Sequence, residues 1–315
     1  MDTTTALESI EIKQLGVFLD YLRKLSEDGI SEENEKYVLR HLDTLSFFSN
    51  LITEHIFPEI HRLTINKKIL GSNKRIHSIA DLKYPPADKV KSYGRCNYPN
   101  QSILYSAFHI MTVMNELKPR MGDLITQTTW KVIENQSIKY CPIFTNQPLK
   151  KNTINPRLIK YQNEFYKALS IYTHKEQQMI NLLVKFVADS FSKQIAPNRH
   201  HDYIFSAYFS NKIFYEFEKG EVEAIYYPSV QEKGSFENLA IKPSVFDKKY
   251  ILSEVIESVV VADPSNGGGG YFMETISHCD QFDWDTKKIL WHKEKYPQPP
   301  AVINGLKDRF KIDLS

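Results

Sequence analysis

A cation, an aromatic ring and a carboxylate follow one another within a short stretch of the chain. Arg95 comes directly after Gly94, Tyr105 lies ten residues after Arg95, and Glu116 lies eleven residues after Tyr105. A guanidinium fork can hold a pyrophosphate, and a tyrosine ring can pack on a base or bond to a ribose hydroxyl. A carboxylate stabilises the cationic sugar that forms when a glycosidic bond breaks. The triple therefore predicts a site that holds a dinucleotide and cleaves a glycosidic bond.

Each of these three residues also has a plain structural interpretation. Arg95 follows a glycine that lets the backbone approach a phosphate closely, but a surface ion pair is the usual environment of an arginine. Tyr105 lies in an apolar stretch and would serve equally as a core residue. Glu116 has apolar neighbours, although a glutamate near a helix end is often only solvated.

Further residues could complete a nucleotide site. Arg62, in an alternating stretch, would supply a second cation, and Lys74 and Arg75 compete with it for that role. Hydroxyl and amide groups would bind ribose or close the pocket: Ser206, with Ser210 as a weaker substitute, Ser229, Asn97 and Asn238. The two asparagines could instead cap loops. No Gly-x-Ser-x-Gly motif is present, so a serine hydrolase triad is unsupported.

Taken in order, these residues resemble the RES-domain family, which is named for an arginine, a glutamate and a serine. The resemblance rests on Arg62, Tyr84-Pro85-Pro86, Gly94-Arg95-Cys96-Asn97, Leu104-Tyr105, Glu116, Ser206, and Tyr227-Pro228-Ser229 with Asn238, and covers roughly residues 58–262. It implies an α+β fold similar to the ADP-ribosyltransferase and diphtheria-toxin group, a split mixed β-sheet with helices around a cleft. It also implies NAD as a substrate and not as a cofactor.

The resemblance implies a toxin of a toxin–antitoxin pair. Such proteins act as NAD glycohydrolases or phosphorylases, or they transfer ADP-ribose to a protein. Glu116, Arg95 and Tyr105 would be catalytic, and Arg62, Arg95, Tyr105, Ser206, Ser229 and Asn97 would bind NAD. Partners would be NAD itself and an antitoxin or a protein acceptor. The family's toxins are usually small, so the additional residues here suggest a stand-alone enzyme or a fused regulator.

The sequence favours three segments. Residues 1–57 are predicted to form a helical accessory domain, residues 58–262 the catalytic domain, and residues 263–315 a C-terminal extension. Ser31 and Thr173 are placed as helix N-caps, the latter in a capping box with Glu176. The N-terminal helices would serve packing, partner binding, self-association or covering of a site. The rival function is therefore a non-catalytic interaction protein that uses them.

Composition excludes several other classes of protein. A net charge of +2 gives no indication of nucleic-acid binding, and no apolar run reaches the roughly 20 residues of a membrane helix. Three scattered cysteines fit neither a disulfide framework nor a zinc site, and the N-terminus lacks the pattern of a signal peptide. His200-His201-Asp202 lacks a suitably spaced third ligand. We therefore expect a cytoplasmic protein without a metal.

Overall fold

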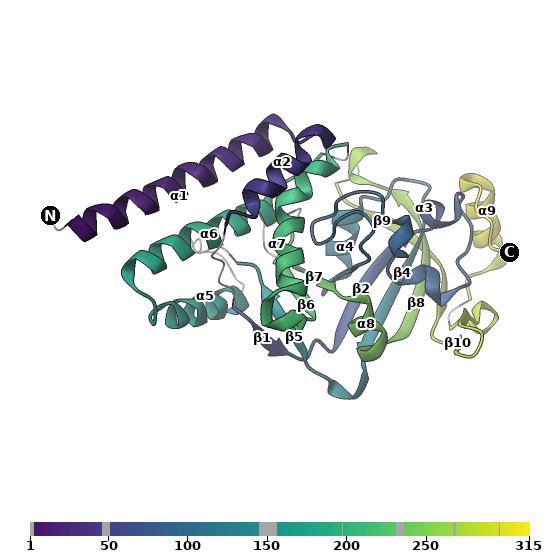
Figure 1. Ribbon diagram of the computed structural model, residues 1–315. Coiled ribbons are helices and arrows are strands. Elements are labelled where there is room, and N and C mark those ends of the chain that lie inside the picture. The colour runs from purple at the N-terminus through teal and green to yellow at the C-terminus, as the bar shows by residue number, and fades with distance from the viewer. Residues whose placement is uncertain are drawn as a thin grey trace. The chain divides into compact units, whose positions relative to one another are not determined.

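The computed structural model describes most of the 315 residues of the chain (Figure 1). The described ranges are 3–45, 51–144, 156–196, 198–230, 236–266, 269–295 and 297–315. The fold is mixed α+β, as the sequence predicts. It divides into two compact units, each built from segments that are distant in the sequence.

Unit 1 comprises Met1–His55, Pro86–Ser102 and Ile138–Ser235. Its helices are α1 (Thr3–Asp28), α2 (Glu32–Leu42), α5 (Pro156–Leu169), α6 (His174–Ser192) and α7 (Ile204–Tyr215), and its strands are β1 (Thr53–His55), β5 (Ile138–Pro142) and β6 (Ala224–Pro228). Strand β5 pairs antiparallel with β1 and parallel with β6.

The N-terminal helices of unit 1 bury their apolar faces against helices from later in the chain. Helix α1 packs on α6, and α2 packs on α7 (Figure 1). Leu19 and Leu22 of α1 and Val38 of α2 are fully buried. This packing stabilises the helices, because most of the stability of a helix in a protein comes from burial of its apolar face. The helical segment predicted at the N-terminus is thus part of a larger unit. The role predicted for residues 1–57 stays a prediction.

Unit 2 comprises Ile56–Pro85, Ile103–Ser137 and Phe236–Ser315. Its strands are β2 (Glu59–Ile65), β3 (Leu104–Ala107), β4 (Leu124–Val132), β7 (Glu237–Ile241), β8 (Tyr250–Ala262), β9 (Phe272–Cys279), β10 (Phe282–Asp283) and β11 (Lys288–Ile289), and its helices are α3 (Asn66–Leu70), α4 (Ile110–Leu117), α8 (Pro243–Lys249) and α9 (Pro300–Phe310). Six strands lie in the order β7-β3-β2-β4-β8-β9, and every neighbouring pair among them is antiparallel.

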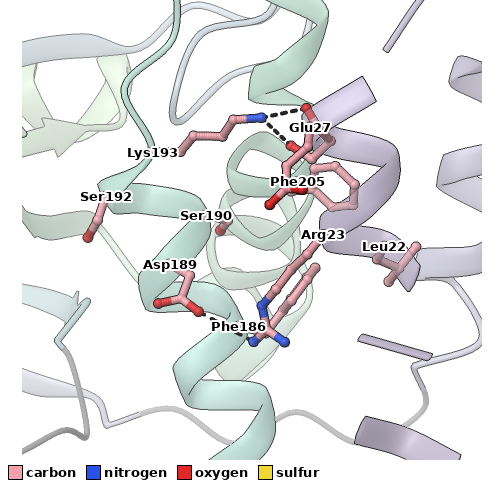
Figure 2. A pocket seen from close by; sticks show the side chains of 10 residues that line it. Leu22, Arg23, Glu27, Phe186, Asp189, Ser190, Ser192, Lys193 and Phe205 are labelled. Atoms are coloured by element: carbon pink, nitrogen blue, oxygen red, sulfur yellow. Dashed lines mark hydrogen bonds and ion pairs between the residues drawn. The ribbon is translucent and has the colours of Figure 1, made fainter. Parts of the chain in front are cut away.

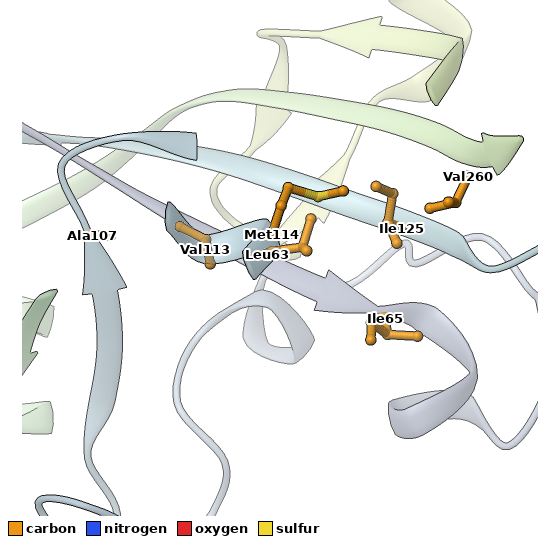
Figure 3. Close-up of a cluster of buried hydrophobic side chains, with 7 residues drawn as sticks. All are labelled: Leu63, Ile65, Ala107, Val113, Met114, Ile125 and Val260. Carbon is orange, nitrogen blue, oxygen red and sulfur yellow. The ribbon is translucent and has the colours of Figure 1, made fainter. Parts of the chain in front are cut away.

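The pairing within this sheet is uneven. Strand β2 pairs with β4 along its whole length, from Glu59 to Ile65, but it pairs with β3 only at His61 and Ala107. Figure 3 shows β3, which carries Ala107, running steeply across the direction of β2. The two strands therefore diverge on either side of one registered pair.

Helix α4 covers one face of this sheet. Leu63 and Ile65 alternate with polar residues along β2, so both point to the same face. They pack with Ile125, and Val113 and Met114 of α4 close the cluster (Figure 3). Figure 3 also places Ala107 and Val260 in this cluster.

The C-terminal segment covers buried residues of the same sheet. Ile312 packs with Leu124, Val259 and Ile276, and side chains of α9 pack against this second cluster. Strand β9 pairs with β8, so residues beyond 262 supply part of the sheet as well as its cover.

The alternation of residues 60–65 predicts a strand, which corresponds to β2. The predicted capping box at Thr173 opens α6, with Glu176 Oε2 accepting the Thr173 N–H at 2.8 Å. Ser31 is the N-cap of α2. The four consecutive glycines at 267–270 predict a flexible loop, which lies partly outside the described residues.

A buried ion pair gives a test of the stability of unit 2. Arg75 donates through Nε and Nη2 to Glu257 Oε2 at 2.9 and 2.7 Å, and the Glu257 side chain is 0% exposed. Burial raises the pKa of Glu257, while Arg75 opposes the rise. Arg75→Met should lower the free energy of unfolding by about 3–5 kcal/mol at pH 7, because it leaves a buried carboxylate unpaired.

The loss in free energy of unfolding caused by Arg75→Met should be smaller at pH 5 than at pH 7. A carboxyl group with a raised folded-state pKa contributes stability at low pH and loses it as the pH rises through that pKa. Urea unfolding at both pH values measures the effect. Lys83→Met, which breaks the partly exposed pair with Asp247, is the control and should cost less than about 1 kcal/mol. Equal losses in free energy of unfolding for Arg75→Met and Lys83→Met would contradict this prediction.

Candidate functional site

Three of the predicted site residues belong to unit 2 and come from neighbouring elements. Arg62 lies on β2, Tyr105 on β3, and Glu116 in the last turn of α4. Asn238 lies on β7, directly opposite Ala107 of β3. The remaining predicted residues, Arg95, Asn97, Ser206 and Ser229, belong to unit 1.

Arg62 holds a guanidinium that no described carboxylate neutralises. Its Nη1 donates to the carbonyl oxygen of Tyr105 at 2.9 Å, and its Nε is buried without a hydrogen-bond partner. Burial lowers the pKa of Arg62 to about 10, so the group remains charged at neutral pH. A partly desolvated cation with an unused donor is costly unless an anion binds to it.

The alternation of the strands separates the side chains of Arg62 and Tyr105. His61 is registered with Ala107, so their side chains share one face of the sheet. Tyr105 lies two residues from Ala107 and shares that face, whereas Arg62 is adjacent to His61 and projects to the other. Arg62 therefore meets Tyr105 at the backbone carbonyl and not at the ring.

Glu116 is oriented by an amide from β7. Asn238 Nδ2 donates to Glu116 Oε1 at 3.0 Å, and Asn238 is buried while Glu116 is half-buried. An amide donor fixes a carboxylate in one orientation without neutralising its charge. From the sequence, Asn238 could line the pocket or cap a loop. The structure instead places it on a strand, bonded to the predicted catalytic glutamate.

The two cations that compete with Arg62 are already paired. Arg75 binds Glu257 and lies 4.7 Å from the centre of the Trp291 ring, and Lys74 lies 3.7 Å from Asp313. Of the three, only Arg62 has no carboxylate partner among the described residues. It is thus the one whose charge is available to an anion.

Arg95 binds the C-terminal end of α6. Its Nη1 donates to the carbonyl of Phe191, its Nη2 donates to the carbonyl of Lys193 at 3.2 Å, and its guanidinium carbon lies 5.2 Å from the centre of the Tyr203 ring. The last carbonyls of a helix lack partners within the helix and carry partial negative charge, so a guanidinium stabilises them. Much of the hydrogen-bonding capacity of Arg95 is therefore used inside unit 1.

Asn97 stabilises the turn that carries Arg95. The N–H of Gly94 donates to the carbonyl of Asn97 at 3.0 Å, and Asn97 Nδ2 donates to the carbonyls of Ser92 and Tyr98 at 3.3 and 2.9 Å. Asn97 is buried. The side chain therefore braces the backbone around Arg95.

The predicted serines of unit 1 are buried. Ser206 Oγ donates to the carbonyl of Tyr203 at 3.1 Å, and Ser210 Oγ donates to the carbonyl of Arg95 at 3.3 Å. Ser206 and Ser229 are 1% and 0% exposed, respectively, so neither hydroxyl is open to solvent. Their assignment to an NAD pocket stays a prediction.

A row of polar side chains that the sequence pattern did not predict lies on the α4 side of the sheet. His61 Nε2 lies 3.3 Å from Glu59 Oε1, and its Nδ1 lies 3.3 Å from Thr129 Oγ1. Thr129 is in turn registered with Glu254, which lies 2.6 Å from His278 Nε2. Burial lowers the pKa of His61, although Glu59 opposes the shift. The sequence feature that could have indicated this row is His61, which is adjacent to Arg62 and therefore projects to the opposite face of the strand.

His200-His201-Asp202 has a structural role in unit 1. Asp202 Oδ1 accepts the N–H of Ile30 at 3.1 Å, and Asp202 Oδ2 pairs with Arg199 at 2.7 Å. Across the described ranges, no group of three or more His, Cys, Asp or Glu side chains is arranged to hold a metal ion. In the same part of the chain, no helix is long and apolar enough to cross a membrane.

Comparison with known proteins adds no further assignment. No protein-family model matches the sequence, and no curated protein matches it.

The contacts of Arg95 predict a structural effect within unit 1. Arg95→Met should lower the free energy of unfolding by about 1.5–3 kcal/mol, because it removes charge-assisted hydrogen bonds from buried carbonyls. Arg40→Met, at an exposed arginine in the last turn of α2, should change it by less than about 0.5 kcal/mol. Thermal and urea unfolding followed by circular dichroism measure both. A loss for Arg95→Met no larger than that of the control would show that these bonds do not support α6.

Proposed function

We propose that the chain cleaves NAD at the nicotinamide–ribose bond. The observation that carries the proposal is the guanidinium of Arg62, which is partly desolvated and has no carboxylate partner and an unused Nε donor. Such a group suits the oxygens of a pyrophosphate. Glu116, held by Asn238 in the same unit, is the carboxylate that the chemistry needs.

The bond cleavage assigns a role to each of these groups. The C1′–N bond breaks, its electron pair goes to the nicotinamide nitrogen, and positive charge develops on the ribose. The carboxylate of Glu116 stabilises that charge, and the Asn238 amide keeps the carboxylate in place. Tyr105 and Glu116 lie on the α4 side of the sheet and Arg62 on the other side, so the proposal requires NAD to pass where β2 and β3 diverge. Arg62 would then bind the pyrophosphate, and the ring of Tyr105 would pack on the nicotinamide or bond a ribose hydroxyl. Water or phosphate then attacks the ribose.

The divergence of β2 and β3 supports the resemblance to the RES domain and to the ADP-ribosyltransferase group. Proteins of that group are expected to have a split sheet, and in this chain β2 and β3 share only the pair His61 and Ala107. On this basis we propose a RES-type toxin. Arg95, Asn97, Ser206 and Ser229 belong to unit 1, and their part in NAD binding remains what the resemblance implies.

Transfer of ADP-ribose to a protein is the alternative reaction, because the chemistry on NAD up to departure of nicotinamide is the same. A non-catalytic interaction protein is the alternative from another class. Nicotinamide release from purified protein supports cleavage, and label from radioactive NAD that appears on a second protein supports transfer. Neither signal would favour the interaction protein.

Replacement of the proposed catalytic carboxylate gives the first test. Glu116→Gln keeps the shape of the side chain and removes its charge. It should lower the rate of nicotinamide release by at least about 100-fold, which corresponds to roughly 3 kcal/mol of lost transition-state stabilisation. Glu274→Gln, at an exposed glutamate of β9, is the control and should retain full activity. Turnover of Glu116→Gln within threefold of wild type would remove Glu116 from the mechanism.

Replacement of the two guanidinium groups gives a second test. Arg62→Lys should weaken NAD binding by about 10-fold or more, because a point charge replaces a fork at a pyrophosphate. Binding of nicotinamide mononucleotide, which has one phosphate, should fall by less. Calorimetric titration in a Glu116→Gln background measures both ligands without turnover. If only Arg95→Lys shows the selective loss, Arg95 and not Arg62 contacts the pyrophosphate.

A further inference from the structure

A cavity of about 320 Å³ lies within unit 1, between α1, the end of α6 and α7. Its apolar wall consists of Leu22, Phe186 and Phe205, and the two rings meet edge to face with centres 5.8 Å apart (Figure 2). The volume equals that of about ten water molecules, enough for a compact organic ligand.

The two cations that line the cavity are already neutralised. Arg23 pairs with Asp20 at 2.6 Å and with Asp189 at 3.3 Å, and it stacks 5.3 Å from the centre of the Phe186 ring. Lys193 lies 3.8 Å from Asp202 Oδ2 and donates to both oxygens of Ser26, at 2.6 Å to the carbonyl and 2.5 Å to the hydroxyl. An anionic ligand would have to displace these contacts.

One of the carboxylates that line the cavity, Glu27, forms no ion pair or hydrogen bond with any described residue. It lies in the last turn of α1, which carries no basic residue, and the last turn of α6 carries none either. Glu27 is exposed, and carbonyls at the ends of both helices are already bound by Arg95 and Lys193, so a cation beside Glu27 would be stabilised mainly by the carboxylate itself.

We propose that this cavity binds a small organic cation, a primary amine that carries a compact aromatic group. The ammonium donates to Glu27, and the ring packs against Leu22, Phe186 and Phe205. Edge-to-face contact with the two phenylalanines suits an aromatic body better than an alkyl chain. The inference rests on unit 1 alone and does not depend on NAD cleavage.

The site lies beside residues that hold Arg95. The carbonyl of Lys193 accepts from Arg95 Nη2, while the ammonium of the same Lys193 contacts Ser26 of α1. Burial lowers the pKa of Lys193, and the negative charges of Asp202 and Glu27 oppose the shift. A cation bound at Glu27 therefore occupies the junction between α1 and the segment that Arg95 stabilises.

Three probes of one shape and different charge test the proposal: 3-phenylpropylamine, 3-phenylpropanol and 3-phenylpropionate. Isothermal titration of the full-length protein at pH 7 should show the amine binding with a Kd of about 1 mM or tighter, and at least about 10-fold tighter than the other two. Glu27→Gln should weaken amine binding at least about 10-fold. Glu33→Gln, at an exposed glutamate of α2, should leave it unchanged.

Three results would overturn the proposal. Tighter binding of 3-phenylpropionate would assign the cavity to an acid recognised by Arg23 and Lys193. Equal binding of the amine to wild type and Glu27→Gln would place the amine elsewhere. Absence of binding by all three probes to a folded protein would make the cavity a packing gap between helices. Circular dichroism of each variant establishes that the protein is folded.

Discussion

The two-residue alternation of β2 is the constraint on which unit 2 depends. It directs Leu63 and Ile65 toward α4, where burial of apolar surface holds the helix on the sheet. The same alternation directs Arg62 to the other face. A shift of register by one residue would exchange the two sets, placing a charged side chain under α4 and apolar side chains where Arg62 now lies. The apolar packing therefore fixes the place of the proposed anion-binding group.

Arg62 and Glu116 are positioned by different kinds of interaction. Arg62 is held by burial and by one bond to a strand carbonyl, which leaves its Nε unused. Glu116 accepts a hydrogen bond from the uncharged amide of Asn238. A guanidinium and a carboxylate that were paired with each other would be available to no ligand. Their separate supports are what make the NAD proposal physically reasonable.

Unit 1 depends on how the ends of its helices are satisfied. The carbonyls at the end of α6 are bound by Arg95, and the Ser26 carbonyl near the end of α1 is bound by Lys193. Both cations come from outside the last turns of these helices, which have no basic residues of their own. Glu27 interacts with Lys193 electrostatically but forms no ion pair or hydrogen bond with a described residue. The interaction that builds unit 1 thus also creates the electrostatic character of its cavity.

The sequence by itself determined the elements and one strand face. Alternation predicted β2, and the Thr173–Glu176 capping box marked the start of α6, because these signals depend on residues close together in the chain. The composition of the last turns of α1 and α6 was equally readable. The ordered residues Arg62, Arg95, Tyr105 and Glu116 could be chosen as candidates, but their partners could not.

Tertiary structure alone decided those partners. Arg95 meets carbonyls nearly a hundred residues away, and Glu116 meets Asn238, because strand order and helix packing bring these segments together. Likewise, the sequence allows Arg75 as well as Arg62 to supply the second cation, and only the tertiary structure pairs Arg75 with Glu257. Side-chain type states what a residue can bind, whereas long-range packing decides which of those bonds are already made.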